Sequence, residues 1–207
     1  MPLKDNIVHE AQKLFSLNGF LSTGINDIIA AAGTSKGGFY NHFSSKEDLF
    51  CAVLAESQSI WRDKVLCSIN EINSPTDKII QILNNYRDGY LKDSENFPGG
   101  CIFITFSVEL DDTRPHLMKE VIKGFDGFRA LLNKVLDDAI AQGELPQSLN
   151  SDAVTETLFA GMLGASVLYS VEKNDSILDQ SIDSLIEYMN FLSNRYMPNV
   201  IRHSDPT

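Results

Sequence analysis

A chain of 207 residues with 43% hydrophobic and 22% charged residues has the composition of a soluble globular protein, and it can bury a core without a metal ion or a disulfide. Its three cysteines are odd in number and lack CxxC spacing, which argues against a disulfide framework and a zinc site. The N-terminus does not resemble a signal peptide and no run of about 18 apolar residues occurs, so we expect a cytoplasmic protein outside the membrane.

The formal net charge of −11 is unevenly distributed along the chain. Residues 1–50 carry four lysines against five carboxylates, a formal charge of −1, and the other 157 residues carry −10. A protein that binds nucleic acid is expected to show a basic surface. The acidic part would repel DNA and limit non-specific binding, so the charge weakens an assignment to DNA binding without excluding it.

Apolar residues recur at three- and four-residue spacing nearly throughout, which predicts an all-α chain of about nine helices. Asn18-Gly19 is expected to end the first helix, and Ser74-Pro75-Thr76-Asp77 to begin the fifth with a serine cap. The expected helices lie at about residues 7–18, 26–32, 35–43, 46–72, 75–90, 101–110, 115–140, 151–171 and 176–196.

The apolar segment Cys101–Leu110, which follows Pro98-Gly99-Gly100, fits either a buried strand or a buried helix. No other segment offers a strand partner, so we predict a buried helix.

Residues 26–43 fit a helix-turn-helix, with Gly33 free to take a left-handed backbone in the turn. The second helix of such a motif presents small or polar residues to the major groove of DNA. Gly37 and Gly38 each destabilise a helix by roughly 1 kcal/mol relative to alanine. A helix kept for stability alone would avoid them, whereas close approach of the backbone to DNA offers a reason for them.

Gly19-Phe20, Thr23, Asp27-Ile28, Ala32-Gly33, Ser35–Phe43 and Ser45–Leu49 together resemble the N-terminal domain of TetR/AcrR-family regulators. The resemblance covers about residues 4–54. It implies an all-α homodimer that binds palindromic double-stranded operator DNA and is released by a small molecule held in its C-terminal domain. We expect no cofactor and no metal. On this basis we expect a DNA-binding domain over 1–48, a ligand-binding and dimerisation domain over 49–198, and a polar tail over 199–207.

The resemblance also implies roles for individual residues near the DNA. Tyr40, His42 and Thr23 match phosphate-contacting positions, and Lys46 begins a helix whose N-terminus is expected to point at the DNA backbone. Tyr40 and His42 could instead be structural, and we expect Phe39 and Phe43 to pack in the core. The remaining expected contacts are Ser35, Lys36 and Gly38 at the base-reading end, and Asn26, which could replace a helix cap missing at Gly24.

The last two predicted helices could pair with their copies in a four-helix bundle, or their apolar stripes could serve only the core of one chain. The expected dimer residues are Leu158, Gly161, Met162, Ala165, Leu185, Met189 and Leu192. An aromatic-rich middle suggests a cavity for the small molecule, although such side chains are more often plain core. Its candidate lining residues are Tyr86, Tyr90, Cys101, Phe103, Phe106, Phe125, Phe128 and Tyr169, with Glu109 or Arg129 as polar anchors.

Cys101 allows two interpretations. A thiol at a helix N-terminus has a lowered pKa, and this position resembles that of a sensor cysteine in electrophile-responsive members of the family. Alternatively, Cys101 is an inert cysteine buried beside Ile102 and Phe103.

Other classes of function fit the sequence less well. The four histidines are scattered, and there is no HExxH, GxSxG, Walker A or dinucleotide-binding motif, so we expect no enzyme. A helical adaptor that binds only protein would give no reason for the glycines and polar face of residues 35–43. Repression is favoured over activation, because a dimer on operator DNA blocks polymerase without further surfaces.

Overall fold

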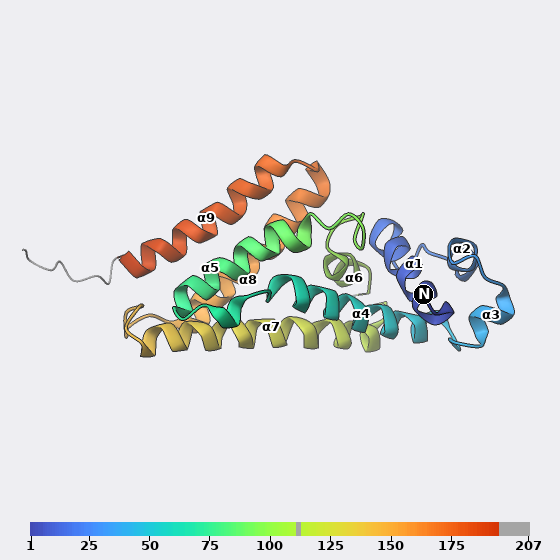
Figure 1. The fold of residues 1–207 in the computed structure, drawn as a ribbon, viewed down its shortest axis with the longest axis horizontal. Helices are drawn as coiled ribbons and strands as arrows, with labels where there is room; N and C mark the ends of the chain where they lie inside the picture. Colours follow the sequence, from blue (N-terminus) through green and yellow to red (C-terminus); the bar gives the residue numbers. More distant parts are fainter. Residues whose placement is uncertain (111–112, 195–207) are drawn as a thin grey trace, which may run out of the picture.

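The computed structural model describes residues 1–110 and 113–194, and within these ranges the chain is entirely helical (Figure 1). This confirms the predicted all-α class. The nine α-helices are α1 Leu3–Asn18, α2 Ile25–Ala31, α3 Lys36–Tyr40, α4 Lys46–Val65, α5 Pro75–Asn85, α6 Ile102–Leu110, α7 Pro115–Ala141, α8 Ser151–Glu172 and α9 Asp175–Asn194. Two short segments, the 3₁₀-helical η1 Ile69–Glu71 and the π-helical η2 Tyr86–Leu91, flank α5.

Helices α1, α2 and α3 form the N-terminal part, and α2 and α3 lie at one end of the molecule (Figure 1). Gly19, with φ of +82°, ends α1, and Gly33, with φ of +61°, makes the turn between α2 and α3. Both are left-handed conformations that glycine adopts without steric cost, as the sequence predicted for the turn at Gly33. The two short helices are therefore set at a fixed angle.

An aromatic cluster joins the N-terminal helices to the rest of the chain. Phe20 of the α1–α2 connection lies 5.4 Å from Phe15 and 5.2 Å from Phe50 of α4, measured between ring centroids. Phe50 in turn lies 4.7 Å from Phe106 of α6. All four rings are buried. The core is thus continuous across residue 48, where the sequence suggested a domain boundary.

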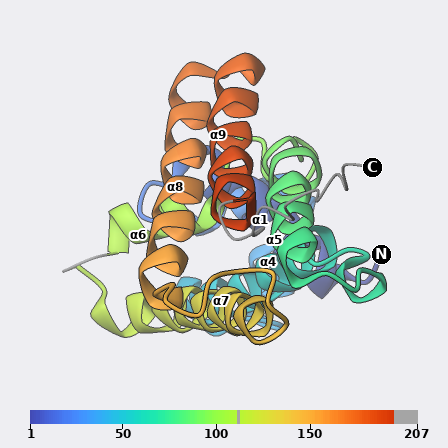
Figure 2. The ribbon, with the colours of Figure 1, turned by 90° about the vertical axis from the view of Figure 1, so that its left-hand side faces the viewer.

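The C-terminal part is a helical body in which α5 packs on α7 and α9, and α7 packs on α8. Figures 1 and 2 show α8 and α9 side by side along one edge of this body. The two helices pack closely at Gly161, where an added Cβ would lie 2.6 Å from a methyl group of the Leu185 side chain. Close packing at this glycine therefore serves the contact of α8 with α9 inside one chain.

The structure differs from the sequence prediction mainly at helix ends. The fourth helix ends at Val65 instead of Ile72, because Ser68 adopts a left-handed backbone with φ of 59° and η1 follows. The fifth helix begins as expected, since the Ser74 hydroxyl accepts a hydrogen bond from the Asp77 N–H at 3.1 Å. Residues 102–110 form a helix, which confirms the choice of helix over strand. The expected polar tail, 199–207, lies outside the described residues.

Helix α8 is also the one described helix that is long and apolar enough, by length and composition, to cross a membrane. The buried share of that apolar window is 39%. A core helix of a soluble protein passes the same test, so this property adds no argument of its own for a membrane.

Candidate functional site

The short helix α3 presents one buried face and one exposed face. Phe39 and Phe43 are buried, which confirms their predicted place in the core. Ser35 caps the helix, because its hydroxyl accepts a hydrogen bond from the Gly38 N–H at 3.1 Å. The Ser35 hydroxyl is thus engaged in the helix cap in this structure, while the side chain as a whole stays exposed.

The outward face of α3 carries most of the residues expected to meet DNA. Lys36 and His42 are exposed, and Tyr40 is 46% exposed. The Tyr40 ring packs edge-on against Phe39, with centroids 5.2 Å apart, and this contact orients the ring. Asn26 of α2 is also exposed, but no side-chain cap forms there, because Asp27 accepts from the Gly24 N–H instead.

Thr23 is buried, contrary to the phosphate contact expected for it. The side chain is 2% exposed, and its hydroxyl donates a hydrogen bond to the Gly19 carbonyl oxygen at 2.7 Å. A hydroxyl used in this way closes the turn after α1 and does not reach the surface. Thr23 is therefore a structural residue in this conformation.

Lys46 also differs from the prediction, because its side chain turns inward. Its ammonium group donates to the carbonyl oxygens of Phe20, at 2.8 Å, and Thr23, at 2.9 Å, and lies 4.4 Å from the centroid of the Phe20 ring. Burial lowers the pKa of Lys46, and the nearby carboxylate of Glu109 acts in the opposite direction. The ammonium is therefore engaged in holding the α1–α2 connection.

Glu109 holds the same connection from the other side. One carboxylate oxygen accepts hydrogen bonds from the backbone N–H groups of Phe20, at 2.6 Å, and Leu21, at 3.3 Å. Gly19 leaves room for this carboxylate, since an added Cβ would collide with it. Glu109 is thus a link between α6 and the N-terminal helices, which corrects its proposed role as a ligand anchor.

The Pro98-Gly99-Gly100 segment makes a second link to α1. The Gly99 N–H donates to the Ser16 hydroxyl at 3.0 Å, and that hydroxyl donates to the Gly100 carbonyl at 3.2 Å. An added Cβ at Gly99 would overlap the Ser16 carbonyl oxygen. Close backbone packing therefore explains Gly99, for which the sequence indicated no role. The segment before α6 is tied to α1, and the end of α6 is tied to the α1–α2 connection.

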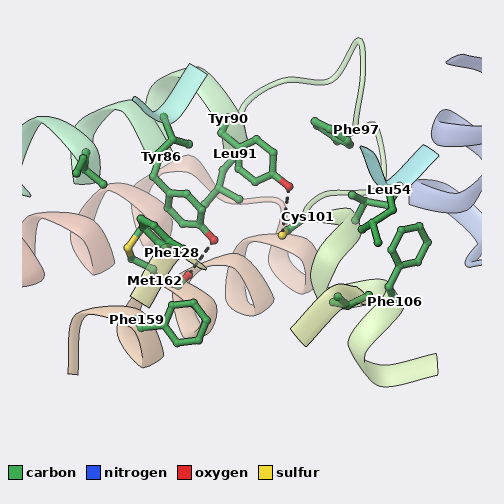
Figure 3. Close-up of a cluster of buried hydrophobic side chains, with 14 of the residues drawn as sticks. Leu54, Tyr86, Tyr90, Leu91, Phe97, Cys101, Phe106, Phe128, Phe159 and Met162 are labelled. Atoms are coloured by element: carbon green, nitrogen blue, oxygen red, sulfur yellow. Dashed lines mark hydrogen bonds between the residues drawn. The ribbon is translucent and has the colours of Figure 1, made fainter. Parts of the chain in front are cut away.

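A cavity of about 590 Å³ lies between α4, α7 and α8. Of the eight residues expected to line a cavity, five do so: Tyr86, Cys101, Phe103, Phe125 and Phe128. Figure 3 shows Tyr86, Phe128, Phe159 and Met162 grouped around one region of the buried cluster. Gln58, Trp61 and Phe159 also line this wall and were not predicted from the sequence. The helical spacing of residues 54, 58 and 61 could have indicated that one face of α4 lines the cavity.

Three expected lining residues lie outside the cavity. Tyr90 packs against Phe97, with centroids 5.2 Å apart, and Phe106 belongs to the aromatic cluster with Phe50. Tyr169 lies near the end of α8. Arg129 does not line the cavity either: its guanidinium stacks over the ring of Phe159, which does, at 4.5 Å and pairs with Glu156 at 3.2 Å.

Cys101 immediately precedes α6, as predicted, but its surroundings favour the neutral thiol. The residue is 5% exposed, and the Tyr90 hydroxyl donates to its sulfur at 3.4 Å (Figure 3). Burial raises the pKa of Cys101, and this effect outweighs the hydrogen bonds to its sulfur that act the other way. Burial likewise raises the pKa of Tyr86 and Tyr90 well above the usual range. The structure therefore contradicts a lowered pKa for this thiol.

The expected dimer residues belong mostly to the core of the protomer. Leu158, Met162, Ala165 and Met189 are buried within the single chain, and Gly161 and Leu185 touch each other across α8 and α9. Leu192 is half-buried against the core. This burial agrees with the alternative interpretation, in which the apolar stripes of the last two helices serve the core of one chain.

The outward face of α8 carries smaller apolar residues at helical spacing. Its exposed members are Ala160, Gly164, Val167, Leu168 and Val171. Val167 and Leu168 are each 44% exposed and Val171 is 77% exposed. This stripe is the apolar surface that a second copy could cover.

Among the described residues, no three His, Cys, Asp or Glu side chains come together as a metal site. Family models match most of the chain. Residues 7–53 match the model described as bacterial regulatory proteins, tetR family, and residues 75–185 match the tetracyclin repressor-like C-terminal domain.

Relatives of known sequence and structure agree with these matches. The HTH-type transcriptional repressor DhaR of Mycobacterium sp. (strain GP1) is 28% identical over 187 residues, which cover 90% of this chain and 91% of DhaR. The crystal structure of a TetR transcriptional regulator from Chloroflexus aurantiacus superposes with a TM-score of 0.84 at 29% identity, and 91% and 94% of the two chains are covered. The reduced form of Escherichia coli NemR shares the fold, with a TM-score of 0.73 at 21% identity over 88% and 94% of the two chains.

Proposed function

The chain belongs to the TetR family of bacterial transcriptional regulators, and we propose that it binds palindromic operator DNA as a homodimer and is released by a small molecule held in the cavity between α4, α7 and α8. DNA binding is supported by the two faces of α3, which lies at the end of the molecule. One face buries Phe39, and the other leaves Lys36 and Tyr40 exposed. A recognition helix needs this arrangement to enter the major groove.

The contacts to DNA come from a small set of side chains. Tyr40 and His42 contact phosphates, and Ser35 and Lys36 lie at the end that faces the bases. Gly38 offers no side chain, and an added Cβ would collide with the Thr34 hydroxyl unless that hydroxyl moved. Lys4 joins this set, because its ammonium lies 5.8 Å from the Phe43 ring, next to α3, in an otherwise nearly neutral region.

Dimerisation doubles this limited half-site and uses the exposed stripe of α8. Ala160, Gly164 and Val167 succeed one another at the spacing of one helix face, so a second copy of α8 can pack along them. An added Cβ at Gly164 would meet no atom of its own chain within 4 Å, which leaves this point open to a partner helix. Dimerisation would also bury the exposed stripe, which explains why the outward face of α8 is apolar as well as its inward face.

The cavity is connected to the DNA-binding end through α6. Cys101 and Phe103, at the start of α6, line the cavity, and Glu109, at its end, binds the backbone of the α1–α2 connection. A ligand that displaces the first turn of α6 therefore acts on the segment that sets the position of α1. Repression is the expected outcome of operator binding, as in the relative DhaR, and the cytoplasm is the expected compartment.

The test is selection of bound duplexes from a random pool by the full-length protein, followed by a salt titration. We expect an enriched palindrome whose half-sites lie about one DNA turn, roughly 34–36 Å, apart, and affinity that falls steeply with salt. Size-exclusion chromatography of the complex should give two protomers per duplex. Failure to enrich any sequence, with the protein folded and dimeric, would contradict the proposal.

A further inference from the structure

The cavity has no charged side chain in its deep part. Charged lining residues come from the outer surfaces of α4 and α7: Arg62 and Lys123 are exposed, and Glu120 is half-exposed and pairs with Lys123 at 2.7 Å. Deeper residues such as Tyr86 and Cys101 are neutral, since burial raises the pKa of both groups. A charged ligand group in this region would lose its hydration without finding a counter-ion.

The walls of the cavity are aromatic and continuous across three helices. Trp61 of α4 lies edge-on to Phe128 of α7, with centroids 4.6 Å apart and planes at 71°. Phe159 of α8 lies 6.1 Å from Phe128 and 5.4 Å from Phe125, again edge-on. Ring edges and faces therefore line the space from several directions, which favours a flat aromatic ligand over a branched aliphatic one.

The lining contains one amide side chain, that of Gln58. The Gln58 side chain is half-buried and its amide makes no hydrogen bond to any described residue, whereas the Tyr86 hydroxyl is engaged with Ser166 and Met162. A half-buried amide without a protein partner is available to a ligand. Gln58 can both donate and accept, so it suits a single hydroxyl, amine or carbonyl group.

Two glycines in the interior of α7 mark where a ligand passes. Gly124 and Gly127 line the cavity one turn apart, although glycine is unfavourable within a helix. An added Cβ at Gly127 would meet nothing within 4 Å, so the position is open, and at Gly124 it would lie 3.1 Å from the Gln58 amide nitrogen. Exposed Ala55 of α4 lines the same side of the cavity, which is therefore open to solvent between α4 and α7.

We propose that the cavity binds an uncharged, planar aromatic molecule with one hydrogen-bonding group, which enters between α4 and α7 beside Gly124 and Gly127 and bonds to the amide of Gln58. This rests on the proposed function, in which the cavity holds the small molecule that controls operator binding. We expect reversible binding without a covalent bond to Cys101. A charged electrophile would meet the exposed rim first, and Cys101 is buried and hydrogen-bonded to Tyr90.

Two fluorescent probes with one skeleton test the charge requirement. N-phenyl-1-naphthylamine is neutral, and 8-anilinonaphthalene-1-sulfonate adds one negative charge to the same rings and bridging N–H. We expect saturable binding of the neutral probe to the full-length dimer, at least about tenfold tighter than that of the sulfonate, because the interior lacks a counter-ion. Equal affinity for the two probes, or tighter binding of the sulfonate, overturns the proposal.

Variants at the mouth test the route and the site. Gly127→Leu and Ala55→Leu, which place a side chain across the opening from opposite helices, should each weaken binding of the neutral probe by about tenfold, while Gly127→Ala stays within about twofold of the wild-type protein. Gln58→Met, which keeps the length and removes the amide, should weaken it by about fivefold. Ala55→Leu changes an exposed position, so it keeps the test valid if Gly127→Leu fails to fold. If Gly127→Leu and Ala55→Leu both bind the neutral probe as tightly as the wild-type protein, the proposed entry route between α4 and α7 is wrong.

Duplex binding measured on the same samples separates this proposal from the one on which it rests. If the protein prefers the neutral probe but binds no duplex, the proposed DNA-binding function is contradicted and the proposed ligand class is supported. A protein that binds its duplex but prefers the sulfonate contradicts the ligand class alone.

Discussion

One carboxylate oxygen of Glu109 lies 2.6 Å from the backbone nitrogen of Phe20, so the end of α6 holds the connection between α1 and α2 by a charge-assisted hydrogen bond. On the other side of this connection the Lys46 ammonium binds carbonyl oxygens, including that of Phe20 itself. The N–H and C=O groups of one short segment are thus satisfied by two opposite charges from two different helices.

Glu109→Ala should lower the free energy of unfolding by about 2 kcal/mol, because it leaves the partly buried N–H of Phe20 and the exposed N–H of Leu21 without their charged acceptor. Glu95→Ala, which removes an exposed carboxylate from a loop, is the matched control and should change stability by less than about 0.5 kcal/mol. Urea unfolding followed by circular dichroism measures both. Equal effects of the two substitutions would show that the link is not stabilising.

Lys46→Met and Tyr40→Phe should separate stability from DNA binding. Lys46→Met removes three backbone contacts of the ammonium and should destabilise the protein by about 1–3 kcal/mol. Tyr40→Phe removes only an exposed hydroxyl, so stability should stay within about 0.5 kcal/mol while affinity for the selected duplex falls by about tenfold. Thermal unfolding and fluorescence anisotropy are the two measurements. A Lys46→Met protein as stable as the wild type would restore this lysine to the list of free DNA contacts.

Val167→Glu should weaken the dimer, because it places a charge in the centre of the exposed α8 stripe. Ile122→Glu is a close control, since Ile122 of α7 is 42% exposed and Val167 is 44% exposed. Sedimentation equilibrium should show a dissociation constant raised at least about 100-fold for Val167→Glu and unchanged for Ile122→Glu. The reverse result would place the interface on α7.

The three thiols should differ in their rate of alkylation. Iodoacetamide at pH 8 should modify exposed Cys67 first and Cys101 last, because Cys101 is buried and burial raises its pKa. Cys51 is exposed, but partial burial and neighbouring carboxylates raise its pKa, so we expect an intermediate rate. Peptide mass spectrometry over time gives the order. Modification of Cys101 ahead of Cys67 would revive the sensor interpretation.

The ion pair of Asp93 and Lys64 predicts a pH dependence of stability. Burial alone would raise the pKa of Asp93, but hydrogen bonds from Asn96 and Lys64, the latter at 3.0 Å, hold it below its ordinary value of 3.8. Because the folded-state pKa is the lower one, the stabilisation is complete well above pH 3.8 and is lost as the pH falls through the folded-state value.

Wild type should therefore exceed Asp93→Asn in unfolding free energy by about 1 kcal/mol at pH 7, and the difference should shrink below about pH 4. Urea unfolding of both proteins from pH 7 to pH 3 measures it. A difference that grows as the pH falls would mean that the carboxylate is not stabilised by its partners.

Features that depend on the local pattern of residues were predicted correctly from the sequence. Helix existence, the turn at Gly33 and the burial of Phe39 and Phe43 follow from spacing and backbone chemistry, and the structure agrees. The end of α4 was missed because Ile69 and Ile72 continue the apolar spacing, and only the left-handed backbone of Ser68 ends the helix. The presence of a serine at this position does not predict a left-handed backbone.

Contacts between segments far apart in the chain could not be predicted from the sequence. The inward turn of Lys46 depends on carbonyl groups that lie 23 and 26 residues earlier, and Glu109 binds a backbone 89 residues away. The burial of the expected dimer residues within one chain was missed for a similar reason. The apolar spacing of Leu158 and Met162 fits an interface, but both are buried within the chain, and the smaller Ala160 and Gly164 are exposed instead.

The aromatic cluster of Phe15, Phe20, Phe50 and Phe106 limits how this protein can be recombined with its relatives. A chimera joined after residue 48 would separate two of these rings from the other two and expose both halves to water. A graft that carries α4 still leaves Phe106 and Glu109 behind on α6. Transfer of this DNA-reading end to another sensor therefore requires matching two helices of the recipient, so the practical unit of exchange is larger than the helix-turn-helix alone.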